Sequence, residues 1–279
     1  MKDIFLHIGA HKTATTAIQI ILLRETGIRS RLAEDPVLLS IHNPVHDYGT
    51  FRTTYTHLRN RMLVALDRGN PVDPALVSEM ARLVQGFVEG LPGRHVVWSD
   101  ENLLGNTPGH PTGQLVQIQG GLYPASDAIS AAFADALAQH SVRVRLYTRD
   151  VESLIRSAYG DWISKLREPT PFGEFDVAVR QGNLDWDGVA APWQQRFGTR
   201  FDRVRFETIR EGQMQYLMNF AEWAKLAVDD TSRLTAARAA NSGLNQRQID
   251  MAKLIMPDMH PEERPALRRF LLQLKPDAP

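Results

Sequence analysis

Near its start the chain reads Ile4-Phe5-Leu6-His7-Ile8, then Gly9-Ala10-His11-Lys12-Thr13-Ala14-Thr15-Thr16, then Ala17-Ile18-Gln19-Ile20-Ile21-Leu22-Leu23. A short apolar run, a polar loop that begins with glycine and a longer apolar run predict a strand, a loop and a helix. Such a loop presents backbone N–H groups at a helix N-terminus, where phosphate or sulfate binds. Lys12 adds a positive charge, and hydroxyl donors come from Thr13, Thr15 and Thr16. The segment therefore predicts a site for a phosphoryl or sulfuryl group.

Three more strands are predicted further along the chain, at residues 95–99, 142–148 and 203–206. Helical patterns separate the strands; over residues 75–88, for example, apolar residues recur at helical spacing. Strands that alternate with helices pair into a mostly parallel sheet that helices cover on both faces. The sequence therefore predicts a three-layer α/β fold with a central, mostly parallel sheet.

Composition limits the classes of partner. The 279 residues are 43% hydrophobic and suit a single domain over residues 1–279, and Lys+Arg and Asp+Glu both total 32, so no basic field would hold nucleic acid or an anionic membrane. The absence of cysteine excludes disulfides, thiolate catalysis and Cys-ligated metals. The N-terminal segment Met1–Ile4 is too short and too acidic for a signal peptide. No apolar run approaches the roughly 18 residues of a membrane span. We expect a soluble, cytoplasmic protein.

Two stretches rich in proline or glycine, residues 36–57 and 105–126, are expected to form long loops. Loops of this length serve either as lids over a site or as surface insertions without a role, and both interpretations stay open. From about residue 207 the chain is expected to be helical, with helices at 214–227, 245–255 and 261–274.

The loop resembles a motif of a known family. His7 to Thr16 is similar to the 5′-phosphosulfate loop of the sulfotransferases that use PAPS (3′-phosphoadenosine 5′-phosphosulfate), in the bacterial form His-Lys-Thr-Gly-Thr-Thr. It is not a Walker A loop, because His11 rather than glycine precedes Lys12. The resemblance implies a P-loop-kinase-like fold, and it implies that the phosphosulfate is held by Lys12, Thr13, Ala14, Thr15, Thr16 and Ala17. Ala14 replaces the usual glycine, and a positive φ there would strain an alanine.

A second family signature is an arginine at a strand end with a serine eight residues later, which together hold the 3′-phosphate of PAPS. Arg149 and Ser157 have this spacing. Asp150 is a suitable N-cap for the following helix, and Ser157 lies off its apolar stripe, on the side that Ser153 and Asp161 share. The alternative for Arg149 is a surface ion pair. A late loop containing Arg238 and Asn241 also resembles the family's loop over the adenine, although a plain turn is the alternative.

The resemblance implies sulfuryl transfer from PAPS to a hydroxyl or amine of a small-molecule, carbohydrate or lipid acceptor, leaving PAP (3′,5′-adenosine bisphosphate) and requiring no metal. Lys12 would neutralise the leaving oxygen. The general base is either Glu101 or His11, with Asp100 as its support or as the base itself. A glutamate base needs partial burial to raise its pKa. Histidines 42, 46, 57 and 110 fit no zinc motif and are expected to be solvated.

Two alternative functions remain open at this point. The first is an ATP-dependent kinase of a small molecule, which would need Mg²⁺ and would tolerate loss of Ser157. The second is a non-catalytic nucleotide-binding protein, in which neither Glu101 nor His11 would affect any sulfated product.

Overall fold

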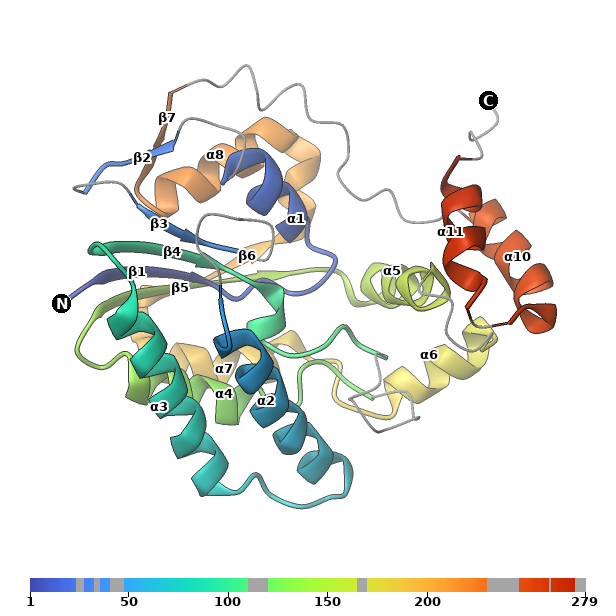
Figure 1. Ribbon diagram of the computed structural model, residues 1–279, viewed down its shortest axis with the longest axis horizontal. Helices are drawn as coiled ribbons and strands as arrows, with labels where there is room; N and C mark the ends of the chain where they lie inside the picture. The colour runs from blue at the N-terminus through green and yellow to red at the C-terminus, as the bar shows by residue number, and fades with distance from the viewer. Residues whose placement is uncertain are drawn as a thin grey trace.

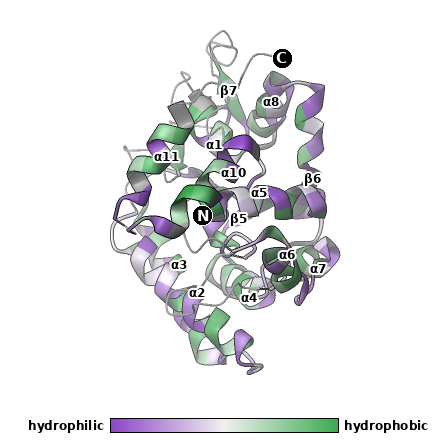
Figure 2. Ribbon diagram, turned by 90° about the vertical axis from the view of Figure 1, so that its right-hand side faces the viewer, coloured by the Kyte–Doolittle hydropathy of each residue, from purple (hydrophilic) through white to green (hydrophobic). Residues whose placement is uncertain are grey.

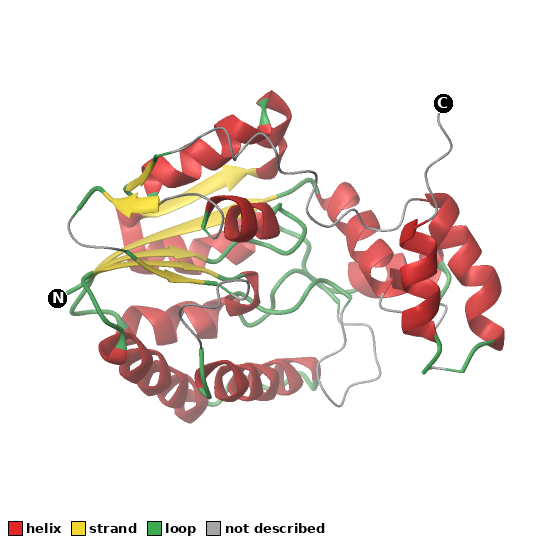
Figure 3. Cartoon of the chain, turned by 45° about the horizontal axis from the view of Figure 1, so that its top comes forward, coloured by secondary structure: helices red, strands yellow, loops and turns green. Residues whose placement is uncertain are grey.

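A five-stranded parallel sheet forms the centre of the protein. The computed structural model describes residues 1–23, 28–32, 36–40, 48–109, 120–164, 170–229, 246–260 and 262–273. The strand order is β3 (Val37–Leu39), β4 (His95–Ser99), β1 (Asp3–His7), β5 (Ser141–Thr148) and β6 (Phe201–Arg205), and all neighbouring strands are parallel (Figures 1 and 3). The predicted α/β fold with a central parallel sheet is confirmed. β1, which precedes the polar loop, is the middle strand.

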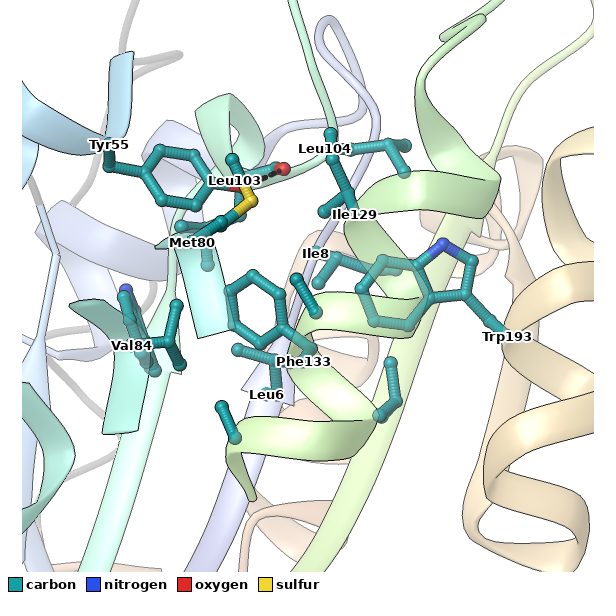
Figure 4. Packing of buried hydrophobic residues seen from close by; sticks show 14 of the residues in the cluster. Leu6, Ile8, Tyr55, Met80, Val84, Leu103, Leu104, Ile129, Phe133 and Trp193 are labelled. Atoms are coloured by element: carbon teal, nitrogen blue, oxygen red, sulfur yellow. Dashed lines mark hydrogen bonds between the residues drawn. The ribbon is translucent and has the colours of Figure 1, made fainter. Parts of the chain in front are cut away.

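One face of the sheet carries the larger core. Because side chains alternate along a strand, Ile4, Leu6 and Ile8 point to the same side, where they join a buried cluster with the helices below the sheet in Figure 1. These helices are α2 (Phe51–Asp67), α3 (Pro74–Gly90), α4 (Ser126–Ala136) and α7 (Trp186–Phe197). Figure 4 shows Leu6 and Ile8 lying around Phe133 of α4 and Trp193 of α7. This packing fixes β1 from below.

The opposite face carries Phe5 and His7, beneath the helix that follows the polar loop. That helix consists of α1 (Thr15–Ala17) and a π-helical turn over Ile18–Leu22, and it packs beside α8 (Gln213–Trp223). A second, two-stranded antiparallel sheet of β2 (Ile28–Ser30) and β7 (Leu226–Val228) lies on the same side (Figure 1). Helices therefore cover both faces, as a three-layer fold requires.

Several boundaries differ from the sequence-based predictions. Residues 36–57, expected to form a loop, contain β3 and the start of α2. The prediction missed β3 because a strand of three residues shows no alternation. It missed the start of α2 because that start adjoins a segment rich in turn residues. The helix predicted at 214–227 ends at Trp223, since Lys225 has a φ of 54° and the chain then forms β7. Residues 41–47 and 110–119 lie outside the described residues.

A third group of helices lies beside the sheet. α5 (Val151–Ser164), α6 (Phe172–Arg180), α10 (Gln246–Ile255) and α11 (Arg264–Gln273) share a separate apolar cluster. Figure 2 views the molecule from this side. The predicted helices near 245–255 and 261–274 are confirmed as α10 and α11, the latter beginning at Arg264. None of the helices in the described ranges combines the length and apolar character that crossing a bilayer requires.

Candidate functional site

The predicted site segments meet at one edge of the sheet, because the strands that precede them are neighbours. The carboxyl ends of parallel strands lie along the same edge, and ligands of α/β proteins bind there. β4, β1 and β5 end at Ser99, His7 and Thr148, and adjacent backbone hydrogen bonds join the segments that follow: Asp100 N to His7 O (3.1 Å) and Ala10 N to Tyr147 O (3.3 Å). The polar loop therefore lies between the segment of Glu101 and that of Arg149.

Two residues of the loop have a left-handed backbone. The φ angles of Lys12 and Ala14 are 66° and 56°, so the strain expected at Ala14 is present. Ala14 starts the helix, and its carbonyl accepts hydrogen bonds from the N–H groups of Ala17 and Ile18 at 2.9 and 3.3 Å. Left-handed residues within a turn make concave arrangements of N–H groups that suit anions. The loop has this conformation without glycine at position 14.

The threonines of the loop differ in their contacts. Thr13 Oγ1 donates to the Ala10 carbonyl at 2.5 Å, and its own carbonyl accepts from the hydroxyl of Tyr216 on α8 at 2.8 Å. Thr13 therefore holds the loop in shape. Thr15 Oγ1 is buried and has no hydrogen-bond partner among the described residues, so its hydrogen-bonding capacity is unused. The Ala17 side chain packs into the apolar cluster above the sheet, and its N–H already donates to the Ala14 carbonyl.

The two predicted cationic residues lie together. Arg149 Nη1 donates to the carbonyl of Lys12 at 2.7 Å, and Arg149 Nε donates to Ser153 Oγ at 3.0 Å. The guanidinium also lies over the ring of Phe206, 5.0 Å from its centroid. The indole N–H of Trp186 donates to the Arg149 carbonyl at 2.7 Å. Arg149 is thus not a solitary surface charge, and it joins the loop to α5.

One face of α5 points to these charges. Asp150 caps the helix, since its Oδ1 accepts from the N–H of Ser153 at 2.9 Å, as predicted. Ser153, Ser157 and Asp161 follow at intervals of four residues and therefore share a face. Ser153 contacts Arg149, and Asp161 Oδ1 lies 2.9 Å from Nζ of Lys12. Ser157 lies between Ser153 and Asp161 along this face of the helix.

Glu101 begins a 3₁₀ turn directly after β4. Asp100 caps the turn, since its Oδ1 accepts from both the backbone N–H and the side-chain amide of Asn102 at 2.9 and 2.8 Å. Burial, together with the neighbouring Asp100 carboxylate, raises the pKa of Glu101 to about 7, while Gln19 and Lys12 act in the opposite direction. The expected partial burial of this glutamate is therefore present. Asp100 itself is committed to the cap.

His11 is held by an aromatic neighbour. Its backbone N–H donates to the hydroxyl of Tyr123 at 2.8 Å, its Nδ1 lies 3.2 Å from the same oxygen, and the two rings are stacked with centroids 6.1 Å apart. Tyr123 belongs to the segment 105–126 and has a positive φ of 44°. His11 therefore borders the site from the side of that segment.

The remaining predicted residues have varied positions. Thr16 is half-buried at the start of α1, and His57 is exposed on α2. Arg238 and Asn241 lie outside the described residues, as do histidines 42, 46 and 110. Within the described ranges, no three His, Asp or Glu side chains gather as a metal site would require.

Sequence reasoning gave no role to four residues that contact the site: Gln19, Tyr123, Ser153 and Asp161. For Ser153 and Asp161 a signal exists, because both are spaced at four-residue intervals from Ser157 on a predicted helix. For Gln19 and Tyr123 there is none, since each meets its partner only through the tertiary fold.

Comparison with known proteins gives one similar structure. No sequence-family model matches the chain, and no curated protein matches it in sequence. Among solved structures, the crystal structure of a sulfotransferase from Alicyclobacillus acidocaldarius matches with 14% sequence identity and a TM-score of 0.46. The match covers 96% of this chain and 96% of the other.

Proposed function

We propose that the protein is a sulfotransferase that uses PAPS as donor and releases PAP. The observation that carries the proposal is the hydrogen bond from Arg149 to the backbone carbonyl of Lys12, at 2.7 Å. It brings two cationic residues from separate segments to one edge of the sheet. The two phosphate groups of a 3′,5′-bisphosphate nucleotide need two such anion sites.

The loop residues fit the 5′-phosphosulfate end of the nucleotide. Lys12 supplies the charge, Thr15 has a hydroxyl without a hydrogen-bond partner among the described residues, and the left-handed backbone at Lys12 and Ala14 favours an anion-binding curve. Thr13, Thr16 and Ala17 are proposed to complete this end of the site, Thr13 by holding the loop and Ala17 by closing the first helical turn through its hydrogen bond to Ala14. Arg149 and Ser157 are proposed for the 3′-phosphate, with Arg238 and Asn241 over the adenine.

The chemistry asks little covalent work of the protein. When bound, PAPS supplies a sulfuryl group, whose bond to the bridging oxygen breaks as a bond from sulfur to the acceptor oxygen or nitrogen forms. Lys12 is proposed to stabilise the negative charge left on the bridging oxygen. Glu101 is proposed to take the acceptor's proton, because a pKa of about 7 suits a general base near neutral pH. His11 is the second candidate for this role.

The acceptor is proposed to be a small molecule, a carbohydrate or a lipid that approaches next to Glu101. The segments 36–57 and 105–126 are proposed to border its entrance. The contact of Tyr123 with His11 supports this for the second segment, because it brings residues 120–123 beside the loop.

Nucleotide titration tests the donor site. In EDTA, the affinity for PAP should be at least about tenfold higher than the affinity for 5′-AMP, because only PAP offers a 3′-phosphate to Arg149. Arg149→Ala should remove this preference, whereas Arg61→Ala, a control on α2 whose side chain is half exposed, should preserve it. Equal binding of the two nucleotides, or none, would overturn the proposal and favour a kinase that uses ATP and Mg²⁺.

Product formation tests the catalytic role. Against a panel of acceptors, Glu101→Gln should reduce sulfuryl transfer by a factor of about 10² to 10⁴, the usual contribution of a general base. A comparable loss in His11→Ala, with Glu101→Gln near wild type, would assign the base to His11. Tight PAP binding without any sulfated product would indicate a non-catalytic nucleotide-binding protein.

A further inference from the structure

Gln19 is a buried polar residue with apolar neighbours on both sides in the chain. It has no exposed surface and lies in the π-helical turn Ile18–Leu22, where the Leu23 N–H donates to the Ile18 carbonyl five residues earlier at 2.9 Å. Turns of this kind are rare and occur often at functional sites. The turn directs the amide of Gln19 to the end of β4.

The amide connects β4 to the candidate base. Gln19 Nε2 donates to the Ser99 carbonyl at 2.7 Å and to Glu101 Oε2 at 3.2 Å. The orientation of the amide is fixed by chemistry, since a carbonyl oxygen only accepts and the nitrogen must therefore face Ser99. Gln19 Oε1 is buried without a partner among the described residues. The side chain thus gives up hydrogen bonding at one end to keep two acceptors at the other.

A neutral histidine, His7, contacts the Ser99 side chain behind the Gln19 amide. His7 Nδ1 lies 2.8 Å from Ser99 Oγ, which is itself 3.4 Å from Gln19 Nε2. Burial, and then the charge of Arg145, lower the pKa of His7 to about 3, so the ring is uncharged at neutral pH. Gly9 packs against the other side of the ring, where any Cβ would collide with it. The amide of Gln19 therefore lies between the uncharged pair of Ser99 and His7 and the carboxylate of Glu101.

We propose that Gln19 is a positioning residue, which fixes the Glu101 carboxylate beside the polar loop Gly9–Thr16, hereafter the anion loop, and stabilises its ionised form. The inference rests on the proposed function, in which Glu101 acts as the base. A hydrogen bond from an amide to a carboxylate favours the charged form and restricts the carboxylate to one orientation. Both effects are what a base needs in order to accept a proton from an acceptor at a defined place.

Other charged groups also act on Glu101. Asp100 on the same segment disfavours its ionisation, and Lys12 of the loop favours it. Tyr123, which faces it from the segment 120–123, is itself disfavoured from ionising by burial, and its pKa is raised. His11 stacks on Tyr123. Gln19 is uncharged and donates directly to the carboxylate, so its removal separates geometry from net charge.

The test is Gln19→Met, which keeps the volume and removes the donor. Carbon-13 NMR of labelled glutamate side chains, assigned with Glu101→Gln, should show the midpoint of Glu101 about one pH unit higher than in the wild type. The acid limb of the transfer rate should move upward by the same amount, with kcat lowered and PAP affinity changed less than twofold. Gln248→Met is the matched control, since Gln248 is buried on α10 and donates to the Leu271 carbonyl at 2.6 Å.

A second variant and a measurement on the wild type guard against misfolding. Gln19→Glu places a second carboxyl beside Glu101, so the second ionisation of the pair should move further upward. In the wild type, the side-chain ¹⁵N resonance of Gln19 should titrate with the midpoint of Glu101, and this transition should vanish in Glu101→Gln. An unmoved Glu101 midpoint in a folded Gln19→Met protein would overturn the inference. Failure of PAP to bind the wild type would overturn the proposed function alone, because the NMR titration needs no nucleotide.

Discussion

Lys12 Nζ and Asp161 Oδ1 are 2.9 Å apart and form an ion pair between the anion loop and α5. The exposed fractions of the two side chains, 28% and 17%, leave the pair only partly accessible to solvent. The same ammonium group is the charge that an incoming phosphosulfate requires. Asp161 therefore both orients Lys12 and competes with the anion for it.

Replacement of Asp161 by asparagine should strengthen anion binding. Without the carboxylate, the ligand no longer competes with Asp161 for the Lys12 ammonium group. PAP should therefore bind about two- to tenfold more tightly, the range expected for a partly exposed ion pair. Calorimetric titration measures the change. Asp176→Asn, which removes an ion pair with Arg180 on α6, is the control and should leave the affinity unchanged. Weaker binding in Asp161→Asn would show that orientation of Lys12 outweighs competition.

Replacement of Ala14 by glycine should stabilise the fold. Alanine at a φ of 56° is strained, whereas glycine adopts this conformation freely. The gain exceeds the entropy that glycine adds to the unfolded chain, so Ala14→Gly should raise the free energy of unfolding by about 0.5–1 kcal/mol. Urea denaturation measures it. Ala17→Gly, three residues later at a φ of −65°, should instead destabilise by a similar amount; equal effects of the two changes would contradict the explanation.

Replacement of Ser157 by alanine should reduce nucleotide selectivity. Ser157 is proposed to contact the 3′-phosphate, so its loss should weaken PAP binding by about five- to thirtyfold and leave the binding of 5′-AMP unchanged. Parallel titrations with both nucleotides measure the effect. Ser78→Ala on α3 is the control, because its hydroxyl donates to the Pro74 carbonyl far from the site. An equal loss for both nucleotides would place Ser157 away from the 3′-phosphate.

Glu101 should make the stability of the protein depend on pH. Its pKa is raised to about 7 in the folded protein from about 4.5 when unfolded, so the folded state binds the proton more tightly. This contribution is complete below pH 4.5 and is lost as the pH rises through 7. Between pH 5 and pH 8 the wild type should lose about 1–3 kcal/mol relative to Glu101→Gln, which cannot ionise.

Urea denaturation of both proteins at the two pH values tests this expectation. Glu222→Gln, a change at an exposed position on α8, should keep the pH dependence of the wild type. A parallel course of the wild type and Glu101→Gln would mean that Glu101 is ionised in the folded protein at pH 5.

The fold was largely predictable because its central strands are separate apolar runs in the sequence. β1, β4, β5 and β6 all lie within two residues of their predicted positions. β3, β2 and β7 were missed, because strands of three residues have no periodicity and because β2 pairs with β7 across nearly two hundred residues of chain. Local patterns carry no information on such pairing.

The candidate site was predictable where it is local in sequence. The loop was predicted from its pattern of strand, polar loop and helix, whereas Arg149 and Ser157 were expected from the resemblance to a known family. Gln19 was not, since among apolar helical residues it resembles an ordinary interruption, and its contact with Glu101 spans 82 residues. Asp161 was seen only as a neighbour of Ser157, because its ion pair with Lys12 spans 149 residues.

The packing of α5 couples ligand binding at the site to the docking of the C-terminal helices. One face of α5 contacts Lys12 and Arg149, whereas the opposite face buries Ile155 and Tyr159 against α10. A ligand that binds more tightly when α10 is docked on the second face must, by the reciprocity of linked equilibria, also favour that docking. Nucleotide binding should accordingly slow amide hydrogen exchange along α10, which packs on the face of α5 opposite to Lys12 and Arg149.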